Sequence, residues 1–379
     1  MAFSLTSEQQ MIKAMVKEFA EKEIKPIAAQ IDRDREFPRE TIKKMAPLGL
    51  LGMSTPQKYG GAGADFVSFV VAVEEVSRCC SSTAALMVVH NAFVCSVIDR
   101  YGTDEQKRAF LTPLARGERL GAYGLTESAS GSEIGAVQTR ARLSGEGYAV
   151  DGSKRFVIGG GEADTYIVFA KTGERDGISA FIAERGLEGL SFGRPERMLG
   201  VRATSTAPLY LNDCLIPKEN LLGDVGEGIE IARVGLDNLR LGIAAQAVGI
   251  AQAALERCVE YANERVQFGQ PIGRFQAVQR MIVDMATETE AARSLVYRCA
   301  ALRDRGEDFR KEASMAKLFA SSAAVRATKN AIRVHGGYGY MRDYPLERLA
   351  RDARVTAIYG DPSEIQRNVI AKVLLGYED

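Results

Sequence analysis

A run of small and polar residues about a third of the way along the chain could bind a phosphorylated or heteroaromatic ligand. It reads Tyr-Gly-Leu-Thr-Glu-Ser-Ala-Ser-Gly-Ser-Glu-Ile-Gly over residues 123–135. A strand that ends in Thr126-Glu127, followed by a loop of small residues, exposes backbone N–H groups and hydroxyls. Such a loop suits a polyphosphate or the edge of a flavin.

Four further motifs follow in order along the chain and add weight to this interpretation. They are Lys154-Arg-Phe156-Val-Ile158-Gly-Gly, Arg265-x-x-Phe268-Gly, His335-Gly-Gly337-Tyr-Gly and Ile358-Tyr359-Gly360-Asp361-Pro-Ser-Glu364-Ile-Gln-Arg. Their fixed order makes a chance match improbable.

Other catalytic motifs are excluded by their context. Gly189-Leu-Ser-Phe-Gly193 matches a nucleophile elbow, which needs a strand, a turn and a helix, but Arg-Pro follows it and the region is predicted to be a strand. No Gly-x-Gly-x-x-Gly stands between a strand and a helix, and there is no P-loop. With two histidines and no His-Glu-x-x-His, the sequence predicts no metal site.

Composition narrows the class of protein. The 49 basic and 49 acidic residues cancel, which argues against a nucleic-acid partner that would need an electropositive face. Apolar runs such as residues 84–89 are far shorter than the ~20 residues of a membrane span. The six cysteines are scattered without a Cys-x-x-Cys pair, as in a reduced compartment, and the N-terminus lacks the features of a signal peptide. We therefore expect a cytoplasmic protein.

The elements that must position these motifs fall into three blocks. Helical spacing predominates up to about residue 116, with a capping box at Thr6-x-x-Gln9 and a helical run over Glu74–Val97. Short β-branched and aromatic segments then predict strands at 148–150, 156–158, 166–170, 178–182 and 209–211. Long helices are predicted over 238–265 and 274–303. This order predicts an α+β fold.

Taken together, the motifs resemble the acyl-CoA dehydrogenase family over essentially the whole chain. The segments Leu199-Gly-Val-Arg202 and Pro217-x-Glu-Asn-Leu-Leu-Gly223 also lie at that family's usual places. The resemblance implies an N-terminal helical domain (1–118), a middle β-barrel domain (119–229) and a C-terminal four-helix bundle (230–379). It further implies a homotetramer, with FAD between the β domain and the bundle and its adenosine end reaching a neighbouring subunit.

The same resemblance assigns contacts residue by residue. FAD would be contacted by Tyr123, Leu125, Thr126, Gly131, Ser132, Phe156, Ile158 and Glu364, and across subunits by Arg265, Phe268, Gln276, Arg333 and Gly337. An acyl-CoA would be contacted by His90, Ser132, Asp237, Arg240 and Tyr359. For His90, packing within a helix is an equally good interpretation.

The reaction of this family removes the α-proton of an acyl-CoA while a β-hydride passes to flavin N5, and electrons then go to an electron-transferring flavoprotein. A carboxylate base held close to the α-carbon is required. The family's usual glutamate position holds Gly360 here, and the alternative position before Arg240 holds Leu239. Gly360 still offers its backbone N–H to the developing enolate oxygen.

Asp361 is the nearest candidate base, although the run Asp361-Pro-Ser-Glu364 also has the pattern of a helix N-cap. The cap is the favoured interpretation of the two. Further departures are Ile158 in place of a threonine or serine, and Arg333 in place of a glutamine. They indicate a specialised branch.

Three hypotheses follow from these departures. The first is an acyl-CoA dehydrogenase, with an alicyclic acyl group as one option. The others are an acyl-CoA reductase or 1,4-type enoyl-CoA dehydrogenase, and a flavin- and CoA-binding homologue with little dehydrogenase activity.

Overall fold

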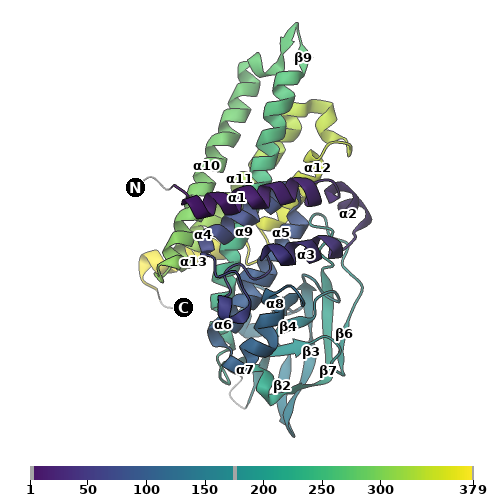
Figure 1. The fold of residues 1–379 in the computed structure, drawn as a ribbon, viewed down its shortest axis with the longest axis vertical. Coiled ribbons are helices and arrows are strands. Elements are labelled where there is room, and N and C mark those ends of the chain that lie inside the picture. The colour runs from purple at the N-terminus through teal and green to yellow at the C-terminus, as the bar shows by residue number, and fades with distance from the viewer. Residues whose placement is uncertain (1–3, 174–176, 378–379) are drawn as a thin grey trace.

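The computed structural model describes residues 4–173 and 177–377, which fold as a helical N-terminal part, a central sheet and a long helical bundle (Figure 1). The first part comprises α1 (Ser7–Phe19), α2 (Ala28–Asp34), α3 (Arg39–Met45), α4 (Phe66–Cys79), α5 (Ser81–Val88), α6 (Ser96–Tyr101), α7 (Asp104–Gln106) and α8 (Thr112–Ala115). The predicted capping box is confirmed, because the Thr6 hydroxyl accepts from the Gln9 N–H while the Gln9 side chain accepts from the Thr6 N–H.

The helical run predicted over Glu74–Val97 is interrupted. At Cys80 the backbone is extended (φ −152°, ψ 110°), so α4 ends there and a new helix begins at Ser81. From α5 the chain continues through a π-helical turn (Val89–Cys95) into α6. This stretch, Ser81–Tyr101, has the length and apolar composition of a membrane span, but 94% of its apolar window is buried inside the protein. It is a central core helix of this fold.

The middle part is a mixed sheet of eight strands. They are β1 (Gly121–Gly124), β2 (Arg140–Ser144), β3 (Gly147–Val157), β4 (Thr165–Thr172), β5 (Gly177–Glu184), β6 (Leu190–Phe192), β7 (Ala207–Pro217) and β8 (Leu221–Leu222). Their order is β6-β7-β3-β2-β4-β5-β8, with β1 parallel to β4. β4 and β5 are buried almost throughout, which explains their continuous apolar sequence. All five predicted strand segments fall at least partly within these strands.

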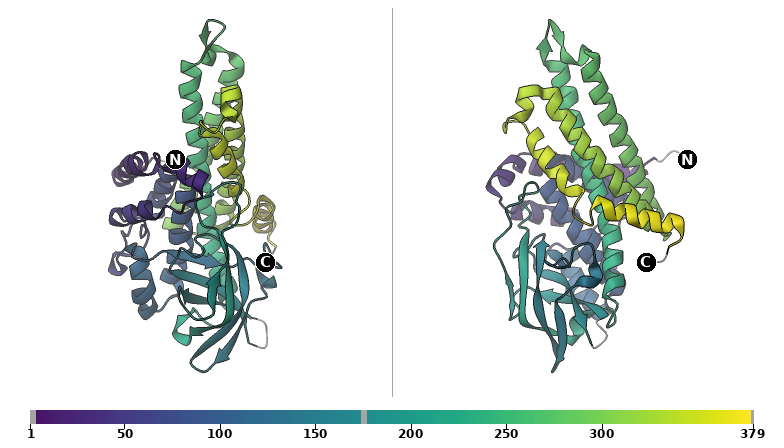
Figure 2. Two further views of the ribbon diagram at one scale, coloured as in Figure 1. Left: turned by 90° about the vertical axis from the view of Figure 1, so that its right-hand side faces the viewer. Right: turned by 180° about the vertical axis from the view of Figure 1, so that it is seen from behind.

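The C-terminal part is built around α9 (Gly228–Glu264), which packs against α4, α10 and α11. The other elements are the hairpin β9 (Val266–Gln267) and β10 (Gln270–Pro271), then α10 (Gln276–Asp304), α11 (Arg310–His335), α12 (Leu346–Thr356) and α13 (Ser363–Leu375). The bundle rises away from the sheet, and the β9–β10 hairpin forms its far tip (Figures 1 and 2). α9 begins earlier than the predicted helix, and its additional N-terminal part contains Gly228 and Gly235.

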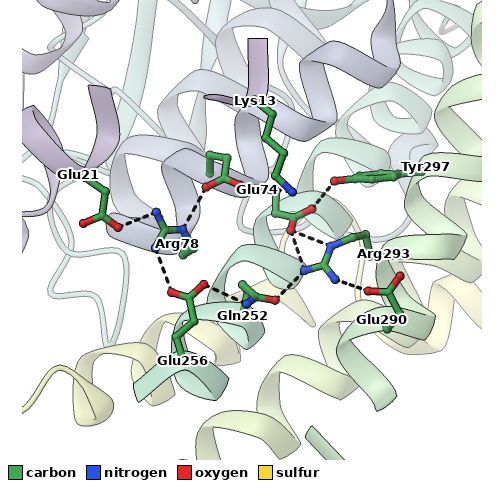
Figure 3. Close-up of polar contacts among 10 residues, drawn as sticks. Lys13, Glu21, Glu74, Arg78, Gln252, Glu256, Glu290, Arg293 and Tyr297 are labelled. Atoms are coloured by element: carbon green, nitrogen blue, oxygen red, sulfur yellow. Dashed lines mark hydrogen bonds and ion pairs between the residues drawn. The ribbon is translucent and has the colours of Figure 1, made fainter. Parts of the chain in front are cut away.

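A buried polar network joins the N-terminal helices to the bundle (Figure 3). Glu74 on α4 accepts from Arg293 Nε at 2.9 Å and from the Tyr297 hydroxyl at 2.8 Å, both on α10. Beside it, Arg78 forms ion pairs with Glu21 and Glu256 at 2.7 and 3.0 Å. The two helical parts are thus held together by ion pairs as well as by apolar packing.

Candidate active site

A cavity of about 500 Å³ lies where the sheet meets the bundle, and we call it the first cavity. Its walls come from the end of β1 and the following loop, the end of β3, the segment 198–201, α12 and the turn before α13. Ten predicted site residues meet here: Tyr123, Leu125, Thr126, Gly131, Ser132, Phe156, Ile158, Tyr359, Gly360 and Asp361. Residues from distant parts of the sequence therefore converge on one space.

Glu127 holds the β1 loop in place. Its carboxylate accepts from Lys154 Nζ at 2.6 Å, from the Thr139 hydroxyl at 2.5 Å and from the Gln138 N–H at 2.6 Å. Burial lowers the pKa of Lys154 to about 8 although Glu127 opposes that shift. Burial also raises the pKa of Glu127, but the charge and hydrogen bond of Lys154 outweigh it, so the net shift is downward. This anchor fixes the loop that leads from Leu125 to Ser132.

The first cavity combines exposed apolar side chains with a polar loop. Phe156, Leu199 and Ile358 line it and are 57%, 65% and 63% exposed. Side chains of this size are normally covered. A Cβ added at Gly131 would meet no atom within 4 Å, so a ligand has room beside the loop. A flat aromatic ring with a polar tail fits this lining.

A second cavity, of about 520 Å³, lies at the other end of the bundle. It is lined by Tyr261, Arg265, Gln267, Ile272, Arg333, Val334, His335, Gly336, Gly337, Tyr338 and Met341. Phe268, at the tip of the hairpin, is 93% exposed, and the exposed Gln276 opens α10 nearby. The hairpin forms the tip of the bundle, away from the sheet (Figure 1). The predicted cofactor contacts therefore fall into two groups, one around the first cavity and one around the second cavity and the hairpin. Glu364 is exposed in the first turn of α13.

A third cavity, of about 570 Å³, opens between α6, α9 and the loop that joins α10 to α11. Four arginines line it, namely Arg100, Arg233, Arg303 and Arg310, together with five carboxylates, those of Asp99, Glu230, Asp237, Glu307 and Asp308. Burial lowers the pKa of Arg303 to about 10. Burial raises the pKa of Asp237 to about 6, although Arg240 opposes the shift. The lining of this cavity therefore carries charges of both signs.

Arg240 connects the third cavity with the first. Its guanidinium is buried and lies 2.5 Å from the Asp237 carboxylate on one side and 2.5 Å from the Asp361 carboxylate on the other. Asp237 lines the third cavity and Asp361 lines the first. A chain of three charged groups thus forms the wall between the two cavities.

The structure overturns the cap interpretation of Asp361. The N-cap of α13 is Pro362, and no side chain caps the helix. Asp361 has φ +70°, in the left-handed region, instead of the extended conformation expected of a cap before proline. Its carboxylate turns to Arg240. Burial raises the pKa of Tyr123, and the charge of Asp361 adds to that shift. Ion pairing with a residue on a distant helix has prevailed over the local capping pattern.

Gly360 has φ +61°, and a Cβ there would clash with Ile243 Cδ1. The backbone and the packing both disfavour a side chain at the position of the family's usual glutamate. Together with Asp361 it forms a turn of two consecutive left-handed residues, and the strain is located at the cavity.

For His90, the packing interpretation is the one that the structure supports. The ring is fully buried, Nε2 lies 2.8 Å from the Leu51 carbonyl oxygen, and Nδ1 accepts from the Gly121 N–H at 3.0 Å. Both ring nitrogens have backbone partners, and His90 lines none of the three cavities. Substrate contact at His90 is therefore a wrong prediction for this conformation. Tyr359 does line the first cavity, and its hydroxyl donates to Gln246.

Sequence reasoning missed Lys317 and Gln366, which donate hydrogen bonds to the carbonyls of the turn formed by Gly360 and Asp361. Lys317 Nζ donates to the Asp361 carbonyl, and Gln366 Nε2 donates to the carbonyls of Gly360 and Asp361 at 3.2 and 3.1 Å. A signal was present, because Lys317 is a charged residue on a helical face that it shares with Ala313 and Ala320. In the part of the chain that the structure describes, no cluster of three metal-ligating side chains occurs.

Comparison with known proteins agrees with this geometry. Three family models match, for the acyl-CoA dehydrogenase N-terminal domain (residues 6–118), middle domain (122–214) and C-terminal domain (226–375). A short-chain specific acyl-CoA dehydrogenase of Clostridium acetobutylicum is 46% identical over 98% of this chain and 99% of its own. An acryloyl-CoA reductase (NADH) of Anaerotignum propionicum is 45% identical over 99% of this chain and 96% of its own.

Among solved structures, a chain from a study of the electron transferring flavoprotein of Acidaminococcus fermentans matches with a TM-score of 0.98. It is 46% identical and covers 99% of this chain and 100% of its own. The residues of the first cavity, the three matching domain models and these full-length relatives lead to one conclusion: the chain belongs to the acyl-CoA dehydrogenase family, whose members are FAD-dependent oxidoreductases.

Proposed function

We propose that this protein oxidises a short-chain acyl-CoA, with Asp361 as the base that removes the α-proton. The observation that carries the proposal is the position of the Asp361 carboxylate. It lines the first cavity together with Tyr123, whose pKa it affects, and it stands on a left-handed turn. Backbone strain of this kind is commonly kept where function depends on it. The short acyl group is supported by the Clostridium relative named above.

FAD supplies the hydride acceptor when it is bound. The exposed apolar side chains of Phe156 and Ile358 would cover its ring and exclude water, and the loop ending at Ser132 would contact its polar tail. Asp361 would accept the α-proton of the acyl group at its carboxylate. The Gly360 N–H would hold the thioester oxygen, where charge develops as the proton leaves.

Arg240 serves this chemistry by orienting Asp361. Its guanidinium lies 2.5 Å from the Asp361 carboxylate, and this charge-assisted contact holds the carboxylate at the first cavity.

The third cavity is the place on this chain where the phosphorylated arm of CoA would meet arginines, which bind phosphates through several N–H donors. Five carboxylates share its lining, so only part of the space suits a phosphate. For one acyl-CoA to occupy both the third cavity and the first, the ion pairs of Arg240 with Asp237 and Asp361 would have to open.

A second candidate function is reduction of an enoyl-CoA, in which Asp361 would deliver a proton instead of accepting one. It is favoured by the relative named acryloyl-CoA reductase. For this direction the hydride would come from the reduced flavin, so the test uses enzyme reduced beforehand with dithionite: crotonyl-CoA in deuterated water should then give butyryl-CoA with one deuterium at the α-carbon. An alicyclic acyl group is a narrower option, and the relatives named above give it no support.

We further propose a cytoplasmic homotetramer that passes electrons to an electron-transferring flavoprotein. The tetramer is supported by the separation of the two cofactor-contact groups and by exposed apolar side chains at Phe268, Tyr340 and Leu374. The electron acceptor is supported by the Acidaminococcus chain named above. Size-exclusion chromatography with light scattering tests the tetramer directly.

The experiment that tests the main proposal uses the purified FAD-containing protein under anaerobic conditions. Butyryl-CoA should bleach the flavin of the wild type, and Asp361→Asn should slow bleaching by about 10²–10⁴-fold, the usual contribution of a general base. Asp343→Asn, an exposed aspartate, is the matched control. If Asp361→Asn bleaches within three-fold of the wild-type rate, Asp361 is not the base. If no acyl-CoA bleaches the wild type, the protein is not a dehydrogenase.

A further inference from the structure

Lys317 is a buried lysine directly beneath the Asp361 turn. It lies on α11 with 1% of its surface exposed, among small residues such as Ala313 and Ala320. Its Nζ donates to the backbone carbonyl of Asp361. Within the described residues, no carboxylate lies within ion-pair distance of Lys317 Nζ. A lysine in such a place has lost its hydration without gaining a direct counter-ion.

Burial of this kind is costly. Removing an ammonium group from water is strongly unfavourable even after relaxation of the protein. A leucine or methionine on the same helical face would avoid that cost and would fill the space among the alanines. The lysine forms no ion pair that would offset this cost. What it does form is a hydrogen bond to the Asp361 carbonyl, so its role concerns the conformation of the turn.

The turn is one that the chain would not adopt unaided. Gly360 and Asp361 both have positive φ, and Asp361 precedes a proline, a position at which extended backbone is favoured. Three hydrogen bonds hold its carbonyls on the side of the bundle: one from Lys317 to the Asp361 carbonyl, and one from Gln366 to each carbonyl. Gln366 is fully buried. With the carbonyls held there, the Asp361 carboxylate lies against Arg240 at the first cavity.

We propose that Lys317 is a positioning residue for the proton transfer: by binding the Asp361 carbonyl it holds the strained turn in which the Asp361 carboxylate faces the first cavity. The proposal rests on the proposed function, because it gives Asp361 the role of base. Lys317 touches neither the reacting atoms nor the cofactor-facing wall, so it acts through the turn.

The charges around Lys317 also affect its hydrogen bond to the Asp361 carbonyl. Burial lowers the pKa of Lys317 to about 7, Asp361 and Glu364 oppose that shift, and Arg240 adds to it. Below pH 7 the lysine is therefore charged, and its hydrogen bond to the Asp361 carbonyl is then charge-assisted.

The test compares Lys317→Met with Lys311→Met in the FAD-loaded enzyme. Lys311 lies on the same helix and is partly exposed beside Glu312 at 3.3 Å, so it controls for loss of a lysine from α11. With butyryl-CoA, we expect Lys317→Met to lower kcat by about ten-fold or more, with KM within about two-fold. Lys311→Met should match the wild type in both.

A double variant separates positioning from general damage. Because Lys317 acts through Asp361, adding Lys317→Met to Asp361→Asn should change kcat by less than about two-fold. If the two losses multiply instead, Lys317 acts independently of Asp361 and the proposal is wrong. If Lys317→Met gives no soluble protein, Gln366→Met removes the other donor to the same carbonyl and should show the same loss of kcat with KM within about two-fold.

A crystal structure of Lys317→Met provides a readout that does not depend on turnover. We expect Asp361 to leave the left-handed region and its carboxylate to leave Arg240. A variant structure with both features unchanged would overturn the inference, even if the enzyme has no butyryl-CoA activity. Absence of activity in the wild type, with the turn displaced in the variant, would contradict only the proposed function.

Discussion

Glu74 offers a direct measurement of what the buried network contributes to stability. Its carboxylate is 3% exposed and accepts from Arg293 at 2.8 Å and from Tyr297 at 2.8 Å. Burial lowers the pKa of Arg293, but the charge of Glu74 outweighs burial, so the arginine is bound as a firm cation. Glu74→Gln keeps the shape of the side chain and removes the charge. It leaves Arg293 buried with a single carboxylate partner, Glu290, whose side chain is 69% exposed.

The magnitude follows from the burial of this pair. Breaking a buried ion pair by removing one partner costs about 3–5 kcal/mol. A chain of 379 residues that unfolds as one unit has an unfolding entropy of about 0.8 kcal/mol/K, taking about 2.1 cal/mol/K per residue. A loss of about 3 kcal/mol therefore lowers Tm by about 4 °C.

The assay is differential scanning calorimetry of the FAD-loaded protein, with Glu290→Gln as the matched control. Glu290 pairs with the same arginine at 2.5 Å, but from an exposed position. An exposed ion pair is worth about 0–1 kcal/mol, so the control should change Tm by about 1 °C or less. Equal Tm values for the two variants would refute the reasoning, because they would show that burial of Glu74 does not decide the cost.

Two further predictions concern Gly360 and His90. Gly360→Ala should destabilise the protein by about 1–3 kcal/mol, because the new Cβ meets Ile243 Cδ1 on a left-handed backbone. Adding Ile243→Val, which removes that atom, should recover part of the loss in urea unfolding; no recovery would contradict the predicted clash. Burial lowers the pKa of His90 to about 4, against 6.5 when unfolded, although its carbonyl contacts oppose the shift. Since only the unfolded chain binds this proton between those values, stability should fall by about 3 kcal/mol as pH falls from 6.5 to 4. The stability advantage of the wild type over His90→Gln should shrink over that range, and an advantage that is constant with pH would contradict the assignment.

Local patterns were sufficient for much of the architecture. The capping box at Thr6 depends on residues three apart, and the strands within β4 and β5 are continuous apolar runs that need no distant information. The start of α9 was missed because Gly228 and Gly235 resemble helix breakers. Gly235 is required by packing, since a Cβ there would lie 2.7 Å from the Phe93 ring. That contact is invisible in the sequence.

The candidate site, too, combines features that local patterns predict with features that depend on distant contacts. The first-cavity residues followed from ordered motifs, and the structure brings them together as one lining. The cap interpretation of Asp361 was wrong because the local capping pattern is complete in the sequence. Arg240, which pairs with the Asp361 carboxylate instead, lies 121 residues earlier. For His90 two interpretations stayed open, because its backbone partners at Leu51 and Gly121 come from other elements. Errors occurred where a long-range contact prevailed over a short-range preference.

The shared guanidinium of Arg240 has a thermodynamic consequence. It contacts one carboxylate in each of two cavities, so a ligand that takes its hydrogen bonds in one cavity changes how strongly Arg240 holds the carboxylate of the other. By reciprocity, a group that draws the Asp361 carboxylate away from Arg240 must change the affinity of that ligand by the same factor. Occupancy of the third cavity and the position of the Asp361 carboxylate in the first are therefore linked by one coupling free energy.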